Sequence, residues 1–390
     1  MRFSSSISGA SDAGTAVDEI LRPIDANLTR GMVDLVLLFC TAHFEDELEA
    51  IVERVDSTFS NAVVVGCTAE GTIGHDRELE RTPSISLLAG CLPDVQIRPF
   101  HIRQEHVDGA TTVFDWERIV GASPDANPTF VAFGDPFRVS IHGFIERINK
   151  LFPAAPLVGG IASAGYEPEQ NRLILDGDVL REGIVGVALS GRLIVDTVVS
   201  QGCRPIGKPF VITKGDQNVI RELGGRPALA QLHNVLVGLS KEDDALARQA
   251  LFVGRVIDER KDDFKRGDFL IQNIIGVDRS SGAVGIAGHA RVGATVQFHV
   301  RDAASADEDL RALLAPHARQ DVRAAMLFGC NGRGTNMWPK PGHDVGVLRE
   351  TLGPVPVAGF FCGGEFGPVG GSNFVHGFTA SIALLRGLPA

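Results

Sequence analysis

The sequence has little of what marks several common classes of protein. Its six cysteines stand singly, without a CxxC pair, so neither a disulfide framework nor a zinc ribbon is indicated. No apolar run reaches the roughly 18 residues of a membrane span, and residues 1–14 lack the apolar segment of a secretory signal. The net charge is −11 with no Lys/Arg stripe, which argues against nucleic acid as a partner. We therefore expect a cytoplasmic protein.

Motifs for catalysis and cofactor binding are also missing. There is no HExxH and no His–Cys cluster at ligand spacing, so no metal site is predicted. Residues 160–165 miss the GxSxG elbow because Ile161 stands where its first glycine belongs. Without CxxCH there is no covalently attached haem. We predict no cofactor, although a haem held by one His or Cys stays open because axial ligation needs only one residue.

What the chain does have is a glycine-rich turn that occurs three times. Residues 357–371 hold six glycines in fifteen positions, around Cys362 and Glu365. Residues 63–71 repeat the Cys-x-x-Glu spacing, and residues 157–165 place Gly160 and Ser163 at the same spacing. Glycine lacks a Cβ, so backbone can come close to a neighbour at such turns. The three turns indicate one design used three times.

The segments around the turns repeat as well. Each copy reads as strand, helix, strand, glycine turn and strand, with continuous apolar strands of the kind that are covered on both faces. The copies place their first strand and helix at 33–40 and 45–59, at 130–133 and 141–152, and at 324–328 and 343–352. An earlier helix is predicted over residues 15–28, ended or kinked by Pro23. We expect a mixed α/β fold with mixed sheets.

Residues 195–314 differ from the repeats. Strands are predicted at 269–276, 283–287 and 295–300, and one or two helices over 228–250. At 390 residues the chain exceeds the usual size of one core, so two domains are expected. We predict an N-terminal segment over 1–30, a first domain over 31–220 and a second over 221–390.

Several motifs in order along the chain carry a resemblance to a known family. They include Gly66-Cys-Thr-Ala-Glu-Gly, Pro156-Leu-Val-Gly-Gly-Ile-Ala-Ser, Val199-Ser-Gln-Gly-Cys-Arg-Pro-Ile-Gly, Phe328-Gly-Cys-Asn-Gly-Arg-Gly and Gly359-Phe-Phe-Cys-Gly-Gly-Glu-Phe-Gly-Pro-Val-Gly-Gly. With them the chain resembles FIST proteins, over about residues 30–385, with an N-terminal and a C-terminal FIST domain. The resemblance implies a sensory protein that binds small ligands such as amino acids. It also implies signalling through a separate protein, such as a histidine kinase or a diguanylate cyclase.

The glycine turns are the predicted ligand site. A carboxylate on such a turn can hold an ammonium group, while exposed backbone N–H groups receive a carboxylate. The alternative is that the glycines allow close strand contacts and that Glu caps backbone groups. The candidate ligand-binding residues are Cys67, Thr68, Glu70, Gly159, Gly160, Ser163, Arg204, Asn331, Arg333, Cys362, Gly363, Glu365 and Asn373.

Three further functions stay open beside an amino-acid sensor. One is a haem-binding nitric-oxide sensor, which some relatives in the family resemble. A second is a hydrolase or lyase that uses Cys67 or Cys362 with a glutamate, although no histidine lies near either cysteine in sequence to activate the thiol. A third is an interaction scaffold without a ligand, which predicts a large exposed apolar patch.

Overall fold

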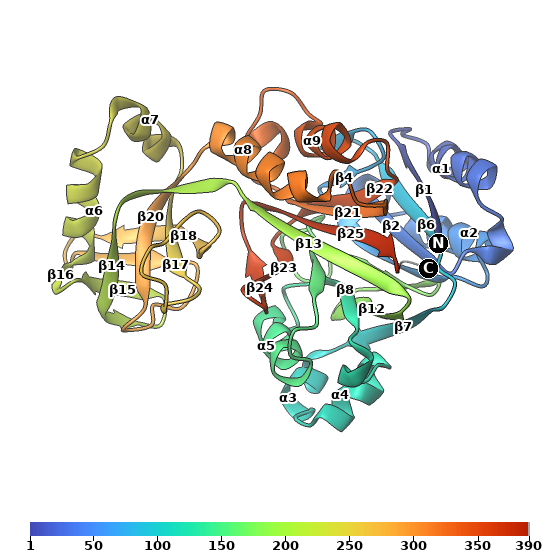
Figure 1. The fold of residues 1–390 in the computed structure, drawn as a ribbon, viewed down its shortest axis with the longest axis horizontal. Helices are drawn as coiled ribbons and strands as arrows, with labels where there is room; N and C mark the ends of the chain where they lie inside the picture. The colour runs from blue at the N-terminus through green and yellow to red at the C-terminus, as the bar shows by residue number, and fades with distance from the viewer. Residues whose placement is uncertain (389–390) are drawn as a thin grey trace. The chain divides into compact units, whose positions relative to one another are not determined.

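The computed structural model describes residues 1–388 as two compact units. Unit 1 comprises Met1–Val199, Leu310–Val375 and the residues from Thr379 onward, and unit 2 comprises Ser200–Asp309 with His376–Phe378. The expected mixed α/β class is confirmed (Figure 1). The two units do not divide at residue 220. The domain boundary that the sequence predicts there stays a prediction. Within residues 1–388, every helix falls short of what a membrane crossing requires.

Unit 1 contains three six-stranded sheets with one common strand order. The first runs β1 (Arg2–Ser8), β6 (Ile85–Cys91), β2 (Leu35–Thr41), β3 (Val63–Ala69), β10 (Leu173–Leu175) and β11 (Asp178–Leu180). The second runs β7 (Val95–Ile102), β12 (Ile184–Gly191), β8 (Thr129–Gly134), β9 (Leu157–Ile161), β23 (Glu365–Val369) and β24 (Ser372–His376). The third runs β13 (Leu193–Gln201), β25 (Thr379–Gly387), β21 (Val322–Cys330), β22 (Val357–Cys362), β4 (Gly71–Ile73) and β5 (Glu78–Glu80). In each sheet the third and fourth strands are parallel.

The last two strands of every sheet form a hairpin that comes from another repeat. The β4–β5 hairpin follows β3 in the chain but pairs with β22. The β10–β11 hairpin follows β9 but pairs with β3, and β23–β24 follows β22 but pairs with β9. The exchange therefore runs once around the three repeats, and no repeat completes its own sheet.

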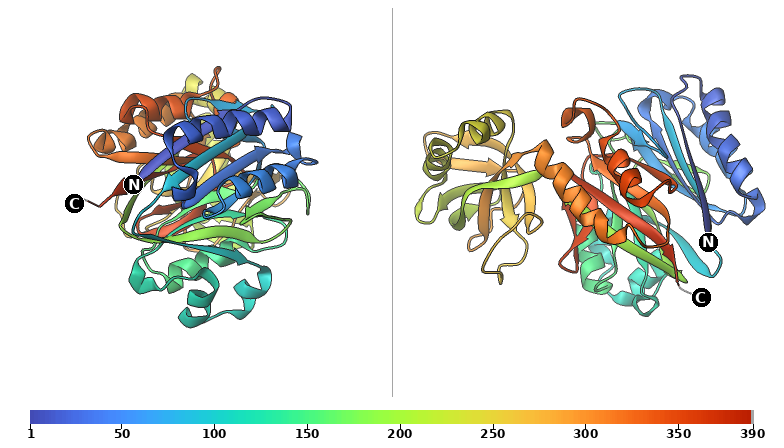
Figure 2. Two further views of the ribbon diagram at one scale, coloured as in Figure 1. Left: turned by 90° about the vertical axis from the view of Figure 1, so that its right-hand side faces the viewer. Right: turned by 45° about the horizontal axis from the view of Figure 1, so that its top comes forward.

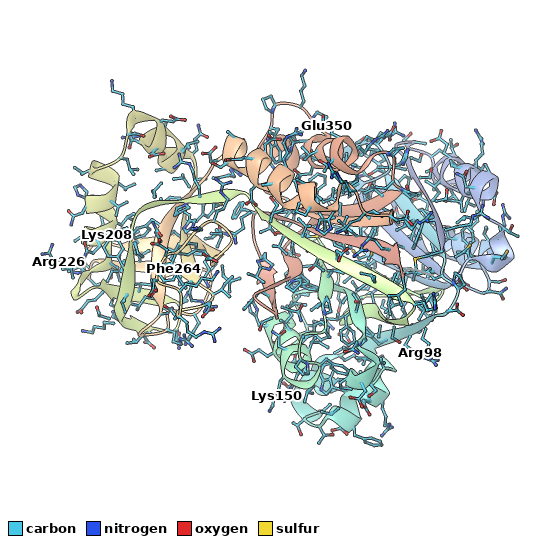
Figure 3. The ribbon with its side chains drawn as sticks, in the orientation of Figure 1. Arg98, Lys150, Lys208, Arg226, Phe264 and Glu350 are labelled. Atoms are coloured by element: carbon cyan, nitrogen blue, oxygen red, sulfur yellow. The ribbon has the colours of Figure 1, made fainter. Side chains whose placement is uncertain are left out.

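Helices cover the outer faces of the sheets. Helices α1 (Ala13–Asn27) and α2 (Leu48–Thr58) lie against the first sheet (Figure 2), and their buried side chains pack with it. Buried side chains of α4 (Val113–Val120) and α5 (Ile141–Leu151) pack with the second sheet. A short helix α3 (Gln104–Gly109) precedes α4. The end of α8 (Ala303–Leu314) and α9 (His343–Leu352) pack with the third sheet. Arg311 of α8 donates a hydrogen bond of 2.7 Å to Glu350 of α9, which Figure 3 labels.

The predicted first helix is present, and of the end or kink expected at Pro23 the end is wrong. Helix α1 continues through Pro23 to Asn27. Proline has no N–H, so it leaves the carbonyl of Glu19, four residues earlier, without its helical partner. The hydroxyl of Ser6 donates to that carbonyl at 3.4 Å, and Ser4 donates to the carbonyl of Pro23. Strand β1, which the sequence analysis did not predict, supplies both serines and so stabilises the helix.

The inner faces of the three sheets share one core. Phe39, Phe133 and Phe328 occupy the same position in the first strand of each parallel pair, and Phe360 joins them. Their ring centroids lie 5.0 Å apart for Phe39 and Phe360 and 5.2 Å apart for Phe39 and Phe133. Offset and edge-on aromatic pairs of this kind add to the free energy of burial. One aromatic cluster therefore joins all three repeats.

Three equivalent glycines bring the parallel strands together next to this cluster. A Cβ at Gly66, Gly159 or Gly359 would lie 1.7, 1.9 or 1.7 Å from a carbonyl oxygen of the neighbouring strand. The register that aligns these glycines also places Cys67 opposite Phe39 and Phe360 opposite Phe328. The equivalent of Cys67 is thus Phe360, so the alignment of Cys67 with Cys362 by their spacing to glutamate was wrong by two residues.

Unit 2 has a seven-stranded sheet whose strands all pair antiparallel. Its order is β14 (Cys203–Asp216), β20 (Thr295–Arg301), β17 (Leu251–Val256), β18 (Phe269–Asp278), β19 (Ala283–Ile286), β15 (Val219–Leu223) and β16 (Arg226–Pro227). Strand β14 pairs also with β15, so the sheet closes on itself. Helices α6 (Ala228–Val237) and α7 (Lys241–Gln249) confirm the pair predicted for this segment. In the chain, unit 2 follows β13, the first strand of the third repeat. At the corresponding point the first repeat has α1, and the second repeat has α3 and α4.

The close approach at the equivalent glycines leads to a stability prediction. We expect Gly359→Ala to lower the free energy of unfolding by about 3 kcal/mol or more, because its Cβ would overlap the Leu327 carbonyl. Urea denaturation followed by circular dichroism measures the change. Gly346→Ala, in helix α9, is the matched control because a Cβ there meets nothing within 4 Å and alanine favours a helix. Equal stability of the two variants would contradict the role of Gly359.

Candidate functional site

The carboxyl ends of β3, β9 and β22 converge in unit 1. The Ser163 N–H donates to the Thr68 carbonyl at 3.3 Å, and the Gly363 N–H donates to the Ile161 carbonyl at 3.0 Å. These are ends of parallel strands, where open α/β sheets usually place their binding sites. The glycine turns predicted from the sequence therefore do lie side by side.

Ser163 connects the three turns through its hydroxyl group. Its Oγ donates a hydrogen bond of 2.5 Å to the Phe361 carbonyl and accepts one of 3.0 Å from the Glu70 N–H. The side chain is buried. Ser163 thus fixes the backbone of the other two turns, and its hydroxyl has its donor and one acceptor position already used.

The two cysteines of the turns are closed off from solvent. Cys67 and Cys362 have no exposed surface. Burial raises the pKa of both thiols well above the ordinary value, and the Cys40 thiol raises that of Cys67 further, as Glu365 does that of Cys362. A Cβ at Gly160 would lie 2.5 Å from the Cys362 Sγ, so this glycine makes room for the thiol. A thiol needs its thiolate form to attack a substrate, and this environment disfavours it.

Glu365 is buried too and is held by Thr379. Its Oε2 accepts hydrogen bonds from the Thr379 N–H at 3.1 Å and from the Thr379 hydroxyl at 2.7 Å. Burial raises the pKa of Glu365 to about 8, although these bonds and the charge of Arg333 act in the opposite direction. At neutral pH the group is therefore largely protonated, which makes it a poor partner for a ligand ammonium group.

Arg333 already has a carboxylate partner within the fold. Its Nε and a terminal nitrogen donate to Asp344 at 2.6 and 2.8 Å, and the guanidinium lies 4.9 Å from the Trp338 ring centre. Trp338 stacks on His343 at 3.7 Å. Burial would raise the pKa of Asp344, but Arg333 outweighs it and holds that pKa at about 2. Arg333 thus fixes the loop of residues 331–342 to the start of α9.

Three other predicted residues have partners that account for them locally. Arg204 belongs to unit 2 and pairs there with Asp302 and Asp243, so it is not part of the strand-end group. Asn373 accepts from the Leu157 N–H at 2.8 Å and donates to the Ala155 carbonyl at 2.9 Å, which joins β24 to the start of β9. Thr68 accepts from the Arg172 N–H at 2.8 Å.

A small cleft opens beside the strand ends. Glu70, Gly71, Glu80, Asn331 and Phe361 line it, and its volume is about 10 Å³, roughly the space of one water molecule. The Asn331 Oδ1 is buried and has no hydrogen-bond partner among the described residues. Two carboxylates and this amide oxygen therefore surround a space that suits one hydrogen-bond donor of the size of an ammonium group.

Glu80 and Arg81 are the site residues that the sequence analysis missed. Glu80 accepts from the Thr335 N–H and hydroxyl, each at 2.9 Å, and so holds the 331–342 loop. Arg81 lies 3.5 Å from a Glu70 oxygen and donates to Asn336 at 2.9 Å, with 58% of its side chain exposed. Glu80 is the last residue of the β4–β5 hairpin and Arg81 follows it, and the exchange of this hairpin brings both to the third repeat. Strands β4 and β5 have only three residues each, which is too short for an alternating pattern that would predict the hairpin or its pairing with β22.

The buried thiols predict the pattern of cysteine modification. We expect iodoacetamide to modify Cys91 first, since it is the one cysteine of the described chain that is not classed as buried. Cys67 and Cys362 should react only as fast as the protein unfolds. Peptide mass spectrometry over a time course, with a urea-unfolded sample as the control, measures this. Rapid modification of Cys362 in the native protein would instead favour a catalytic thiol.

The raised pKa of Glu365 predicts a pH dependence of stability. The folded protein holds a proton on Glu365 up to about pH 8, whereas an unfolded glutamate loses it near pH 4. This contribution is complete below about pH 4 and is lost as the pH rises to about 8, on the order of a few kcal/mol. In Glu365→Gln the urea midpoint should therefore change less between pH 5 and 8 than in the wild type. Glu169→Gln, an exposed control, should follow the wild-type curve, and a wild-type slope in Glu365→Gln would contradict the assignment.

Comparisons with known proteins place the chain in a family. The FIST N domain matches residues 34–226 and the FIST C domain matches residues 228–368. An uncharacterized protein of Mycobacterium tuberculosis is 37% identical over 98% of this chain and 99% of its own length. A second, of Mycobacterium bovis, is 40% identical over 90% of this chain and 89% of its own.

Among solved structures, a cyanuric acid hydrolase from A. caulinodans aligns over 99% of this chain and 100% of its own, at 8% identity and a TM-score of 0.37. Another cyanuric acid hydrolase aligns at 10% identity and a TM-score of 0.29, over the full length of both chains. The family models together span most of the chain. The chain belongs to the FIST family and carries both its N and its C domain.

Proposed function

We propose that the protein is a sensor of a small ligand that carries an ammonium group and a carboxylate, such as an amino acid or a similar metabolite. FIST domains are associated with small-ligand sensing. The proposed site is the cleft lined by Glu70, Glu80 and Asn331, together with Arg81, which lies 3.5 Å from Glu70.

The observation that carries this proposal is the separation of charge across the cleft. Its polar side chains are two glutamates and Asn331, whose Oδ1 has no hydrogen-bond partner among the described residues. A buried acceptor without a partner costs free energy, so a donor from a ligand would be bound favourably. Next to Glu70, the exposed guanidinium of Arg81 suits a carboxylate. A zwitterion would place its ammonium group in the cleft and its carboxylate on Arg81.

The same contacts supply a way to report binding. Arg81 and Glu80 both hold the 331–342 loop, through Asn336 and Thr335 respectively. A ligand that takes over Glu70 and Arg81 would loosen these contacts and shift the position of the loop. Such a shift follows only if the ligand binds one loop position better than the other. We propose that a separate protein, such as a histidine kinase or a diguanylate cyclase, reads the loop.

The buried cysteines count against the alternative of a hydrolase or lyase. Neither Cys67 nor Cys362 reaches the cleft, and the pKa of both thiols is raised. Glu70, by contrast, has 28% of its side chain exposed and forms an ion pair with Arg81. The geometry therefore favours binding over thiol catalysis.

A thermal-shift screen of the twenty amino acids and common amines, followed by calorimetry on each hit, tests the proposal. A ligand that binds only the folded state must raise the melting temperature. Glu70→Gln should weaken binding of the hit by about tenfold or more, because it removes one charge-assisted hydrogen bond. Arg81→Gln should weaken amino acids but affect simple amines less.

Glu169→Gln is the matched control, since Glu169 also pairs with an arginine of unit 1, Arg138, far from the cleft in sequence. It should bind the hit as the wild type does. If no amine raises the melting temperature, or if Glu70→Gln binds with unchanged affinity, the cleft is not the ligand site.

A further inference from the structure

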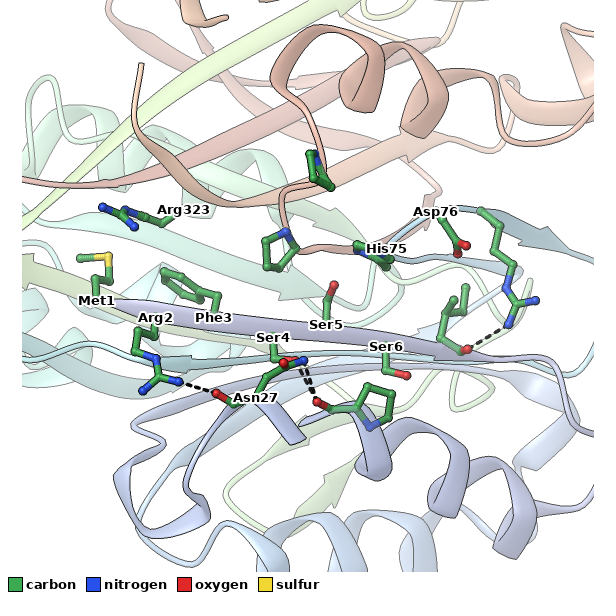
Figure 4. A pocket seen from close by; sticks show the side chains of 15 residues that line it. Met1, Arg2, Phe3, Ser4, Ser5, Ser6, Asn27, His75, Asp76 and Arg323 are labelled. Atoms are coloured by element: carbon green, nitrogen blue, oxygen red, sulfur yellow. Dashed lines mark hydrogen bonds between the residues drawn. The ribbon is translucent and has the colours of Figure 1, made fainter. Parts of the chain in front are cut away.

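Unit 1 has a second and much larger pocket that runs along strand β1. Its volume is about 710 Å³, within the range of sites for small molecules. Figure 4 shows β1 along the length of the pocket, with Arg2 and Arg323 near Met1 and with His75 and Asp76 toward the other end. The lining comes from segments that are far apart in the sequence, namely residues 1–7, Pro23 and Asn27, residues 75–77, Arg323, and Pro354 and Pro356.

The charge of this pocket is opposite to that of the whole protein. Three arginines line it, Arg2, Arg77 and Arg323, together with His75, whereas Asp76 is its only carboxylate among the lining residues. The chain as a whole has a net charge of −11. A positive concavity in an acidic protein attracts anions from solution.

The positive charges of the three arginines are only weakly neutralised by carboxylates. Arg2 donates to the Asn27 carbonyl at 2.6 Å and Arg77 donates to the Ile7 carbonyl at 3.1 Å, and neither forms an ion pair within residues 1–388. Arg323 pairs with Asp321, but both side chains are half exposed or more, and such pairs contribute little. The backbone contacts orient Arg2 and Arg77 while leaving further N–H donors available.

The length of β1 along the pocket sets the size of the ligand. Arg2 begins β1 and Arg77 donates to the carbonyl of Ile7, five residues further along, so the strand between these two positions spans roughly 17 Å. Between them the lining includes Phe3, Pro354 and Pro356, which offer apolar surface, and Ser5, which accepts from the Val357 N–H at 3.0 Å. A molecule that fills this pocket would meet positive charge at both ends and apolar groups between.

We propose that this pocket binds a small molecule with two or more anionic groups, either phosphate esters or carboxylates, and about the size of a nucleotide. Guanidinium groups bind both kinds of anion through paired N–H donors. The site is separate from the Glu70 cleft and shares no lining residue with it.

Calorimetry at low ionic strength tests this with two sets of probes on the full chain. Inorganic pyrophosphate and ADP represent phosphate groups, and citrate represents carboxylates. We expect saturable binding of at least one set to the wild type, and about tenfold or greater weakening in Arg323→Gln. Arg54→Gln is the matched control, because Arg54 is equally an exposed arginine paired with an aspartate of unit 1. Its affinity should equal that of the wild type.

The outcomes separate cleanly. Binding of pyrophosphate or ADP alone identifies a phosphate site, and binding of citrate alone identifies a carboxylate site. No binding of either set overturns the proposal, as does binding that Arg323→Gln and Arg77→Gln leave unchanged. The two proposed sites fail independently, because this one is tested with anions at Arg323 and the other with amines at Glu70.

Discussion

The exchange of hairpins among the three repeats is the constraint on which the rest of unit 1 depends. Each sheet is completed by strands from another repeat, so the repeats fold as one body around the shared aromatic core of Phe39, Phe133, Phe328 and Phe360. The exchange also determines which side chains meet. It brings Glu80 and Arg81, which follow β4, to the 331–342 loop of the third repeat. The candidate cleft exists because of this crossing.

Sequence reasoning recovered the parts of the fold that have a strong local pattern. Strand β2 is buried along its whole length, and α5 buries Ile141, Phe144 and Ile148 on one stripe, so apolar runs and helical spacing predict both. Strand β1 was missed because its serines hide the pattern, although two of those serines complete helix α1. The Cys-x-x-Glu spacing misled the alignment of Cys362, since register is set by pairing with the neighbouring strand and not by spacing along the chain.

The predicted site residues differ in burial, and burial decides which of them are available to a ligand. Glu70 and Glu365 look alike in the sequence, each three residues after a cysteine. In the structure Glu365 lies in the core with its pKa raised to about 8, while Glu70 reaches the cleft beside Arg81. Arg333 similarly looks available in the sequence, but it is buried and two of its nitrogens donate to Asp344. The identity of a residue was predictable, whereas its burial and its partners depend on how the chain packs around it.

Both proposed sites lie where the first repeat meets the third. The cleft takes Glu70 and Glu80 from the first repeat and Asn331 and Phe361 from the third. The larger pocket takes β1 from the first and Arg323, Pro354 and Pro356 from the third, and a hydrogen bond from the Val357 N–H to the Ser5 Oγ joins the two there. Ligands at this junction contact elements of two repeats at once. For the cleft, binding energy can therefore favour one position of the 331–342 loop over another, which is what a sensor requires.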